Sequence, residues 1–424
     1  MRSLRNGTLR KGTWAITALL ATAACINYAD RSSLSIAAPA LSHEMALGDV
    51  QLGLLLSTFF WTYTLCQSIS GWLTDRYPVR SVFAIGFLVW SGATLGCGLA
   101  SGLIGLALLR LLLGAGESVA FPCYSKIIAA RFPIERRGLP NALIEAGTKL
   151  GPAVGTLAGG LVMARFGWRA MFLALGAAGL LWLVPWMRVA PRAEAGSGPQ
   201  GPCPSIAQIL RRRDAWGTFI GNFCYQYGYY FLLTWLPTYL VRERHVSIEL
   251  MSILASLPFW IAAISAVICG SLADRLISRG ASPSRVRKGF VAGGLLLSTA
   301  MVPAAITPDL STSIVLLCLS YAAFGMSASN HWAISQTLAG TAAAGTWSGI
   351  KNTIGNLAGI IAPVSTGWLV QATGGFLAAF ISPAIVAVAG ACSWAFLVRD
   401  VAPIQWAPGY ARSPGYAKSN RSTV

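Results

Sequence analysis

Long apolar runs separated by short polar segments recur along the whole chain. A helix needs about 20 residues to cross a hydrocarbon core about 30 Å thick, and many of the runs reach that length. We therefore predict an all-α integral membrane protein with twelve transmembrane helices. Their approximate ranges are 14–38, 50–74, 81–101, 103–130, 139–164, 167–187, 216–241, 249–273, 288–307, 311–337, 345–371 and 375–398.

The charged residues give the predicted orientation. Only 11% of the residues are charged and the mean hydropathy is +0.60, but Lys and Arg outnumber Asp and Glu by 32 to 14. In a soluble chain the resulting net charge of +18 would suggest nucleic-acid binding. Here the basic residues gather before the first span and after the second, fourth, sixth and eighth, with exceptions at Arg165, Arg242 and Arg244. The positive-inside rule then predicts both termini in the cytoplasm and no nucleic-acid partner.

The chain also repeats itself. The segment GWLTDRYPVR at 71–80 returns as GSLADRLISR at 270–279, and LVMARFGWRAMF at 161–172 matches LVQATGGFLAAF at 369–380. Spans one to six and seven to twelve therefore form two parallel six-helix repeats. The predicted organisation is an N-terminal half, a cytoplasmic linker rich in Pro, Gly and Arg, a C-terminal half, and a disordered cytoplasmic tail. The four segments are 1–187, 188–215, 216–398 and 399–424.

Two six-span halves with this repeated loop resemble the major facilitator superfamily, whose loop motif is G-x-L-x-D-R-x-x-x-R. The resemblance implies the major facilitator fold. An acid at the cytoplasmic end of a span can pair with a base and a helix terminus, which makes the loop a conformational latch that breaks and reforms. A solvated turn with a weak surface pair is the alternative. The latch residues expected from the motif are Gly71, Asp75, Arg76, Arg80, Gly270, Asp274, Arg275 and Arg279.

A narrower resemblance rests on INYADR at 26–31, FFWTYTLCQ at 59–67, Arg110 with Glu117 seven residues later, and LTWLPTYL at 233–240. These elements resemble the anion:cation symporter family, which includes bacterial transporters of hexuronates, galactonate, glucarate and phthalate. The resemblance implies a protein of the bacterial inner membrane, embedded in the lipid bilayer as a monomer. It also implies import of a small organic anion, often driven by protons, without a cofactor.

Several charged residues fall inside predicted spans, where a lone charge costs about 2.5–3.5 kcal/mol. At 1.5 Å per helical residue, Asp30 and Arg110 share one level, while Glu117 and Lys149 lie about 10 Å nearer the cytoplasm. Asp30 and Arg31 are about 100° apart around their helix. We expect Asp30 to face Arg110, Arg31 to project into a central cavity, and Lys149 to meet Glu117 or Glu145.

By match to the family, Asp30 and Glu117 are proton-coupling sites, whereas Arg31 and Arg110 bind the substrate carboxylate. Arginine suits that role because its planar fork binds a carboxylate with two hydrogen bonds. An anion that takes Arg110 from Asp30 would favour protonation of Asp30, which links binding to proton uptake. A static buried ion pair between Asp30 and Arg110 remains the alternative.

Other residues match family positions that line the cavity, and we predict that they contact the substrate. They are Tyr28, Tyr63, Thr148, Lys149, Ser329, His331, Trp332 and Asn352. Lys149 can meet a second substrate carboxylate or only neutralise Glu117. His331 can carry a proton or simply pack in the core, and Glu145 has a structural role near the cytoplasmic end.

The sequence shows no metal-ligand cluster, phosphate loop or nucleophile–base pattern, so we predict neither an enzyme nor a metal site. Two other functions stay open. GTKLGPAVG at 147–155 resembles an antiporter element, which would suit a proton-coupled exporter of a metabolite or drug. A membrane sensor that binds an anion without moving it is the other. The basic residues Arg31, Arg110 and Lys149 argue against a cationic-drug exporter, so we predict a proton-coupled importer of a small organic carboxylate.

Overall fold

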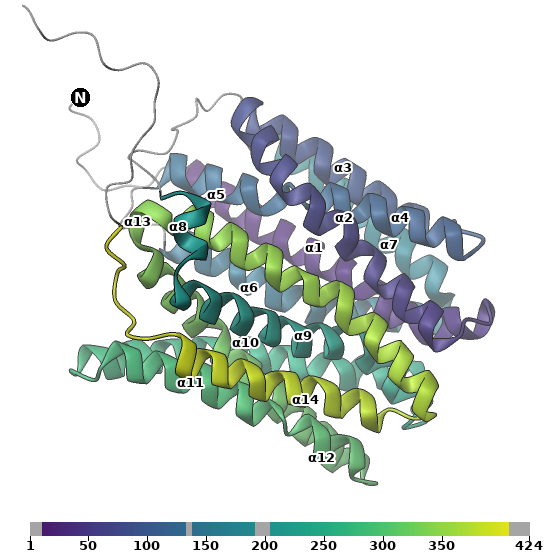
Figure 1. The fold of residues 1–424 in the computed structure, drawn as a ribbon. Helices are drawn as coiled ribbons and strands as arrows, with labels where there is room; N and C mark the ends of the chain where they lie inside the picture. The colour runs from purple at the N-terminus through teal and green to yellow at the C-terminus, as the bar shows by residue number, and fades with distance from the viewer. Residues whose placement is uncertain (1–10, 133–137, 191–203, 407–424) are drawn as a thin grey trace, which may run out of the picture.

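The computed structural model describes residues 11–132, 138–190 and 204–406, and helices of similar direction dominate this part of the chain (Figure 1). The bundle has two ends. We call the end that holds Lys11 and Trp406 the terminal end; it lies on the left in Figure 1. The opposite end, with turns such as 45–48 and 98–102, is called the loop end.

Six membrane crossings come from the first half of the chain. α4 (Leu103–Glu117) continues into α5 (Ala120–Arg131), so these two helices make one crossing. The other elements are α1 (Lys11–Glu44), α2 (Asp49–Arg76), α3 (Val79–Cys97), α6 (Gly138–Val154), the π-helix η2 (Gly155–Gly159) and α7 (Gly160–Val189). α6, η2 and α7 follow one another without a gap, and Gly167, with a φ of 83°, divides this continuous stretch into two crossings.

Six further crossings follow in the second half. Gly340, with a φ of 62°, divides the 64-residue α13 into two crossings in the same way. α11 and α12 together make one crossing, as do α14 and η3. The elements are α8 (Ile206–Leu210), α9 (Arg213–Arg242), α10 (Ile248–Ser278), α11 (Pro283–Ser298), α12 (Met301–Ile306), α13 (Leu310–Thr373), α14 (Leu377–Cys392) and the π-helix η3 (Ser393–Leu397).

These twelve crossings confirm the predicted all-α membrane fold. The expected linker, 188–215, and tail, 399–424, stay predictions, because residues 191–203 and 407–424 lie outside the described part of the chain.

Three of the crossings are unusually polar. Among the described residues, eight helical stretches are long and apolar enough to cross a membrane, and one of them, Leu143–Val189, contains two crossings. α1, α2 and α9 do not reach that standard. α1 packs against α9 and α2 against α13, so these polar helices lie where the two halves of the chain meet. Polar residues in a membrane protein face the bundle interior, which places the candidate site along these three helices.

Glycines bring α6 against α1. Gly147, Gly151 and Gly155 lie four residues apart on one face of the helix, as in small-residue packing motifs of membrane helices. A Cβ at Gly151 would lie 2.5 Å from the backbone oxygen of Cys25 and 2.7 Å from Cβ of Tyr28. The antiporter-like element GTKLGPAVG therefore has a packing function here, because only glycine allows this approach.

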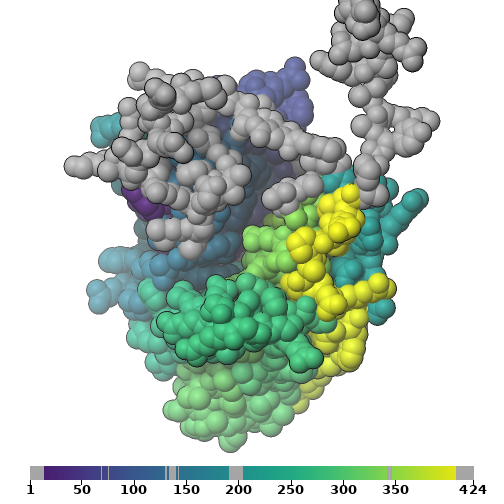
Figure 2. All heavy atoms as spheres, turned by 90° about the vertical axis from the view of Figure 1, so that its left-hand side faces the viewer, coloured from purple at the N-terminus to yellow at the C-terminus, as the bar shows by residue number. Residues whose placement is uncertain are grey.

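The halves are joined by polar contacts at the loop end. Arg242 of α9 forms an ion pair with Asp49 of α2, and the backbone N–H of Val50 donates to Oε1 of Gln371 at 3.4 Å. Both contacts link the two halves of the chain. Figure 2 looks onto the terminal end, where the blue N-terminal elements and the green and yellow C-terminal elements lie on opposite sides. The structure is thus closed at the loop end.

Candidate functional site

A buried ion pair joins α1 to α4 near the middle of the bundle. Nε of Arg31 donates to Oε2 of Glu117 at 2.8 Å, and the two side chains are 2% and 0% exposed. The guanidinium also lies over three aromatic rings, at 4.4 Å from the ring centre of Tyr28, 4.3 Å from Tyr63 and 4.9 Å from Phe59. The rings and Glu117 together hold the positive charge of Arg31 in the core.

The sequence analysis did not predict this pair. Of the two acids that it left open to Lys149, Glu117 pairs with Arg31. Glu145 is the one that interacts electrostatically with Lys149. That Arg31 also faces a cavity stays a prediction. α4 packs on α2 and α3, whereas α6, which carries Lys149, packs on α1 and α10. The depth of a residue along its helix does not show which helices are neighbours, so the predicted common level of Glu117 and Lys149 could not establish a contact between them.

Asp30 and Arg110 meet through the backbone. Nη1 of Arg110 donates to the carbonyl oxygen of Asp30 at 3.2 Å, and the residues are 2% and 1% exposed. Their predicted common level is confirmed, but the side chains do not form the expected direct pair. Neither carboxylate oxygen of Asp30 forms a hydrogen bond of normal geometry in the described part of the chain, although the hydroxyl of Thr94 is close enough to interact with it, and Nε of Arg110 has no partner there. The charges that act on Asp30 most strongly are those of Glu117 and Arg110.

Unused polar atoms surround both contacts. Nη2 of Arg31 and Oε1 of Glu117 are also buried without a partner in the described part of the chain. Leaving buried charged atoms unsatisfied costs free energy, and native proteins usually avoid it unless the group has a role in binding or proton transfer. The four residues therefore have free capacity for an anion and for protons.

A second cluster lies in the C-terminal half around Lys351, which is fully buried. Its Nζ is 2.9 Å from Nδ1 of His331 and 3.9 Å from the ring centre of Trp332. Its backbone oxygen accepts from Nδ2 of Asn222 at 3.1 Å. The sequence analysis missed Lys351, although a lysine inside a predicted span is itself a functional signal.

Lys149 extends from the first half towards this cluster. Its Nζ lies 5.2 Å from the ring centre of Tyr229 on α9. Glu145, which is exposed and lies one turn earlier, is the acid that interacts electrostatically with Lys149. Lys149 in turn interacts electrostatically with His331. Lys149 is thus a basic group of the N-terminal half that contacts the C-terminal half.

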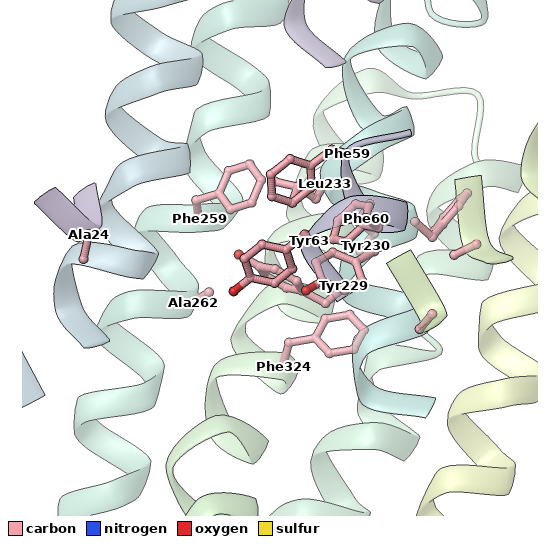
Figure 3. Packing of buried hydrophobic residues seen from close by; sticks show 14 of the residues in the cluster. Ala24, Phe59, Phe60, Tyr63, Tyr229, Tyr230, Leu233, Phe259, Ala262 and Phe324 are labelled. Atoms are coloured by element: carbon pink, nitrogen blue, oxygen red, sulfur yellow. The ribbon is translucent and has the colours of Figure 1, made fainter. Parts of the chain in front are cut away.

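Tyrosines fill the space between the Arg31 pair and the Lys351 cluster. Figure 3 shows Tyr63, Tyr229 and Tyr230 close together, with Phe60 beside Tyr230 and Phe324 nearby. The ring centres of Phe60 and Tyr230 are 4.5 Å apart, and those of Tyr229 and Tyr230 are 5.9 Å apart. The hydroxyl of Tyr230 donates to Asn356 at 2.9 Å, whereas the buried hydroxyl of Tyr229 has no partner among the described residues.

The remaining predicted contact residues divide into two groups. Tyr28, Tyr63, His331 and Trp332 belong to the clusters just described, and Asn352 is half-buried next to Lys351. Thr148 is buried, but its hydroxyl donates to the carbonyl oxygen of Glu145 within α6 at 2.8 Å. Ser329 is exposed and donates to Ala266 of α10 at 3.1 Å, so it does not join them.

The predicted latch loops make contacts within their own halves. Nη2 of Arg80 donates to the carbonyl oxygen of Met187 at the end of α7, and Arg76 lies over the ring of Trp72. In the second loop, Oδ1 of Asp274 accepts from Arg287 at 3.0 Å. The side chain of Asp75 lies outside what the structure describes. A latch between the halves therefore stays a prediction.

The family model of the Major Facilitator Superfamily matches residues 20–363. The chain belongs to this superfamily. It is accordingly a multi-pass membrane transporter and not an enzyme, as predicted.

Similar proteins with names agree with the resemblance to the anion:cation symporter family. A protein of Bacillus subtilis named "Probable galactarate/D-glucarate transporter" is 31% identical over 420 residues, covering 92% of each chain. A D-galactonate transporter of Escherichia coli O6:H1 is 30% identical over 403 residues, covering 89% of this chain and 93% of the relative. A solved bacterial homologue of the human lysosomal transporter Spinster has a TM-score of 0.76 at 19% identity, covering 95% of this chain and 100% of its own. The last likeness concerns the fold alone.

Proposed function

We propose that this protein imports a small organic carboxylate across the bacterial inner membrane together with protons. The observation that carries the proposal is an excess of positive charge at the centre of the bundle. The described central residues include two acids, Asp30 and Glu117, and four bases, Arg31, Arg110, Lys149 and Lys351. An apolar bundle that retains surplus cations is suited to an anionic ligand. Relatives named for sugar-acid transport support the same class of substrate.

The anion step begins at Arg31. Its Nε is occupied by Glu117 and its Nη2 is unused, so one edge of the fork is available to a carboxylate. A substrate carboxylate that binds Arg31 competes with Glu117 for the same charge. Glu117 then loses its counterion and binds a proton. Binding of the anion and uptake of the proton are linked because both depend on one guanidinium.

Asp30 provides the second proton site. It is buried, Thr94 is the one hydroxyl among the described residues that interacts with its carboxylate, and Glu117 and Arg110 are the charged residues that interact with it most strongly. A carboxyl group in such surroundings is best accommodated with a proton bound. One proton per monoanion would make transport electroneutral. With two, the membrane potential contributes about 2.3 kcal/mol per 100 mV, and two acidic sites favour this stoichiometry.

Transport would proceed as in other two-repeat transporters, by rocking of the halves around the central site. The loop-end contact between Asp49 and Arg242 holds the halves together in the present structure. The positive-inside pattern places the terminal end in the cytoplasm. The repeated loops at that end, including Arg80 and Asp274, would engage across the halves in the opposite state. We propose that one chain suffices for the cycle.

Proteoliposomes with an imposed inward proton gradient test this function. Labelled sugar acids, dicarboxylates and aromatic acids would be offered in turn, with a protonophore as the control for coupling. At least one anion should accumulate, and the protonophore should abolish the accumulation. Failure of every anion to enter would refute the proposal, and gradient-driven depletion of a preloaded anion would favour an exporter.

The variant Asp30→Asn separates proton coupling from substrate binding. It should abolish gradient-driven uptake and retain exchange of labelled for unlabelled anion. Asp400→Asn changes an exposed acid beyond η3 and should behave as the unmodified protein. Equal loss of uptake and exchange in a well-folded Asp30→Asn protein would favour a static structural role for Asp30.

A further inference from the structure

Lys351 adds to the surplus of central bases but has no contact assigned to it in the proton and anion steps above, and it is the most deeply buried of these bases. Its side chain is 0% exposed, and its Nζ contacts Nδ1 and the backbone oxygen of His331, at 2.9 Å and 3.5 Å. An ammonium group carries three donors and one full charge. Within the described residues, no acid pairs with that charge. Lys351 therefore has both a donor and a charge to offer to a ligand.

The same contact decides how His331 meets a ligand when Lys351 is protonated. The ammonium can then only donate, so Nδ1 of His331 would accept and Nε2 would carry the ring hydrogen. The imidazole is 3% exposed and its ring centre lies 4.9 Å from that of Tyr225. Lys351 and His331 together thus present hydrogens rather than lone pairs, which suits an acceptor such as a carboxylate.

Lys149 adds a third base from the opposite half. It lies over Tyr229 and acts electrostatically on His331. The acid that interacts electrostatically with both Lys149 and Lys351 is Glu145, which is exposed and lies one turn from Lys149. The aromatic rings of Trp332 and Tyr229 stabilise the two ammonium groups only in part. A cluster of three bases on two halves remains short of negative charge.

We infer that Lys351, His331 and Lys149 form a second anion subsite, and that the transported substrate is a dicarboxylate whose other carboxylate binds Arg31. This inference rests on the proposed function, because it takes Arg31 as the first subsite. One carboxylate satisfies the N-terminal half, and the other satisfies the surplus charge around Lys351. The substrate thereby contacts both halves, as rocking around a central ligand requires.

The surface between the subsites indicates what joins the two carboxylates. Tyr63 contacts Arg31, and Tyr229 contacts Lys149, so tyrosines lead from one subsite to the other (Figure 3). The buried hydroxyl of Tyr229 has no partner among the described residues, and Gln226 and Asn356 hydrogen-bond the hydroxyl of Tyr230. Such a lining of rings and hydroxyls fits a hydroxylated carbon chain better than an apolar one. A hydroxylated dicarboxylate is the substrate class that these contacts favour.

A matched pair of ligands tests the second subsite directly. D-Galactonate and galactarate share their carbon chain and hydroxyl configuration and differ at one end, which is a hydroxymethyl group in the first and a carboxylate in the second. The dissociation constant of each would be measured by calorimetry with the full-length protein in detergent. The unmodified protein should bind galactarate about tenfold more tightly or better, the size expected for one additional charged hydrogen-bonded contact.

Lys351→Gln should weaken the binding of galactarate much more than that of D-galactonate, and so remove most of this preference. A thermal unfolding curve in detergent checks that the variant is folded. Lys149→Gln changes the base in the other half and should also reduce the preference for galactarate. This variant replaces Lys351→Gln as the test if Lys351→Gln does not fold. Lys288→Gln changes a lysine of α11 that contacts the carbonyl oxygen of Val398, away from the site, and should keep the full preference.

The outcomes distinguish this inference from the proposed function. If the unmodified protein binds both ligands equally, or if Lys351→Gln and Lys149→Gln weaken both ligands equally, the second subsite is refuted while an anion transporter remains. If neither sugar acid nor any other organic anion binds, the proposed function fails as well.

Discussion

Replacing Glu117 by glutamine removes the negative charge of the buried pair with Arg31 and keeps the size of the side chain. The amide oxygen can still accept the 2.8 Å hydrogen bond from Nε. What changes is the electrostatic balance, because a guanidinium that is 2% exposed then lacks a counterion. If a substrate anion replaces Glu117 as the partner of Arg31, this change lowers the stability of the empty protein and raises its affinity for an anion.

The magnitude follows from the surroundings of Arg31. Removing one partner of a buried ion pair costs about 3–5 kcal/mol. The retained hydrogen bond and the three rings, at 4.3–4.9 Å from the guanidinium, offset part of this. Cation–π contacts contribute about 0.5–2 kcal/mol depending on burial, so we expect a net loss of about 2 kcal/mol. The same free energy is regained when a carboxylate binds Arg31, which corresponds to about 30-fold tighter anion binding.

Three measurements on purified protein check these expectations. Thermal unfolding in detergent should shift down by several degrees, as expected for about 2 kcal/mol in a protein of this size. Calorimetry should show the gain in anion affinity, and proteoliposomes should retain exchange but lose proton-driven accumulation. Glu44→Gln breaks the exposed pair with Arg169, 2.7 Å long, and should change neither affinity nor coupling. Unchanged or weaker anion binding by Glu117→Gln would refute the competition between Glu117 and the substrate.

Three other predictions concern packing, gating and pH. Gly151→Ala should destabilise the protein by about 1–3 kcal/mol in thermal unfolding, because its Cβ would overlap the backbone of α1, whereas Gly92→Ala meets open space and should be neutral. Alanine substitutions at Asp49, at Arg242 and at both residues form a double-mutant cycle, which should give a coupling free energy of about 0.5–1 kcal/mol for this partly exposed pair. Spin labels on the loop-end turns of α2 and α13 should move apart when the pair is removed. Additive effects on stability and an unchanged distance between the labels would contradict a gate. Asp309 caps α13, and its hydrogen bonds with Thr312 lower the pKa of its carboxyl group from 3.8. The stabilisation of the folded protein by this cap should therefore be present above pH 3.8 and disappear as the pH falls through the lowered folded-state pKa. Unfolding curves of the unmodified protein and of Asp309→Asn should thus differ in their pH dependence only in that acid range.

The fold could be predicted because its signals are local. Each crossing needs its own apolar run, and the repeated loops at 71–80 and 270–279 align the two halves without any knowledge of contacts. Even the breaks within α7 and α13 fall at glycines, Gly167 and Gly340, near the expected ends of spans. The hydrocarbon core imposes these features on the sequence one segment at a time.

The site could be predicted only in part, because its pairs depend on which helices are neighbours. Helical rise placed Asp30 level with Arg110, but it could not choose between the two acids open to Lys149 or show that Glu117 pairs with Arg31. Lys351 was missed for a different reason. Its partner, His331, is 20 residues away on the other side of the break at Gly340, and no sequence spacing reveals that contact.

The glycine contact between α6 and α1 has a consequence for how substrate size is recognised. Gly151 packs the helix that carries Lys149 against the helix that carries Arg31, so these two bases lie on neighbouring helices of the N-terminal half. Lys351 lies in the C-terminal half. In the proposed rocking of the halves, the distance from Arg31 to Lys351 would change, whereas the distance from Arg31 to Lys149 would stay nearly constant. Lys149 would then select ligands by their length, and Lys351 would bind such a ligand only when the halves are close together.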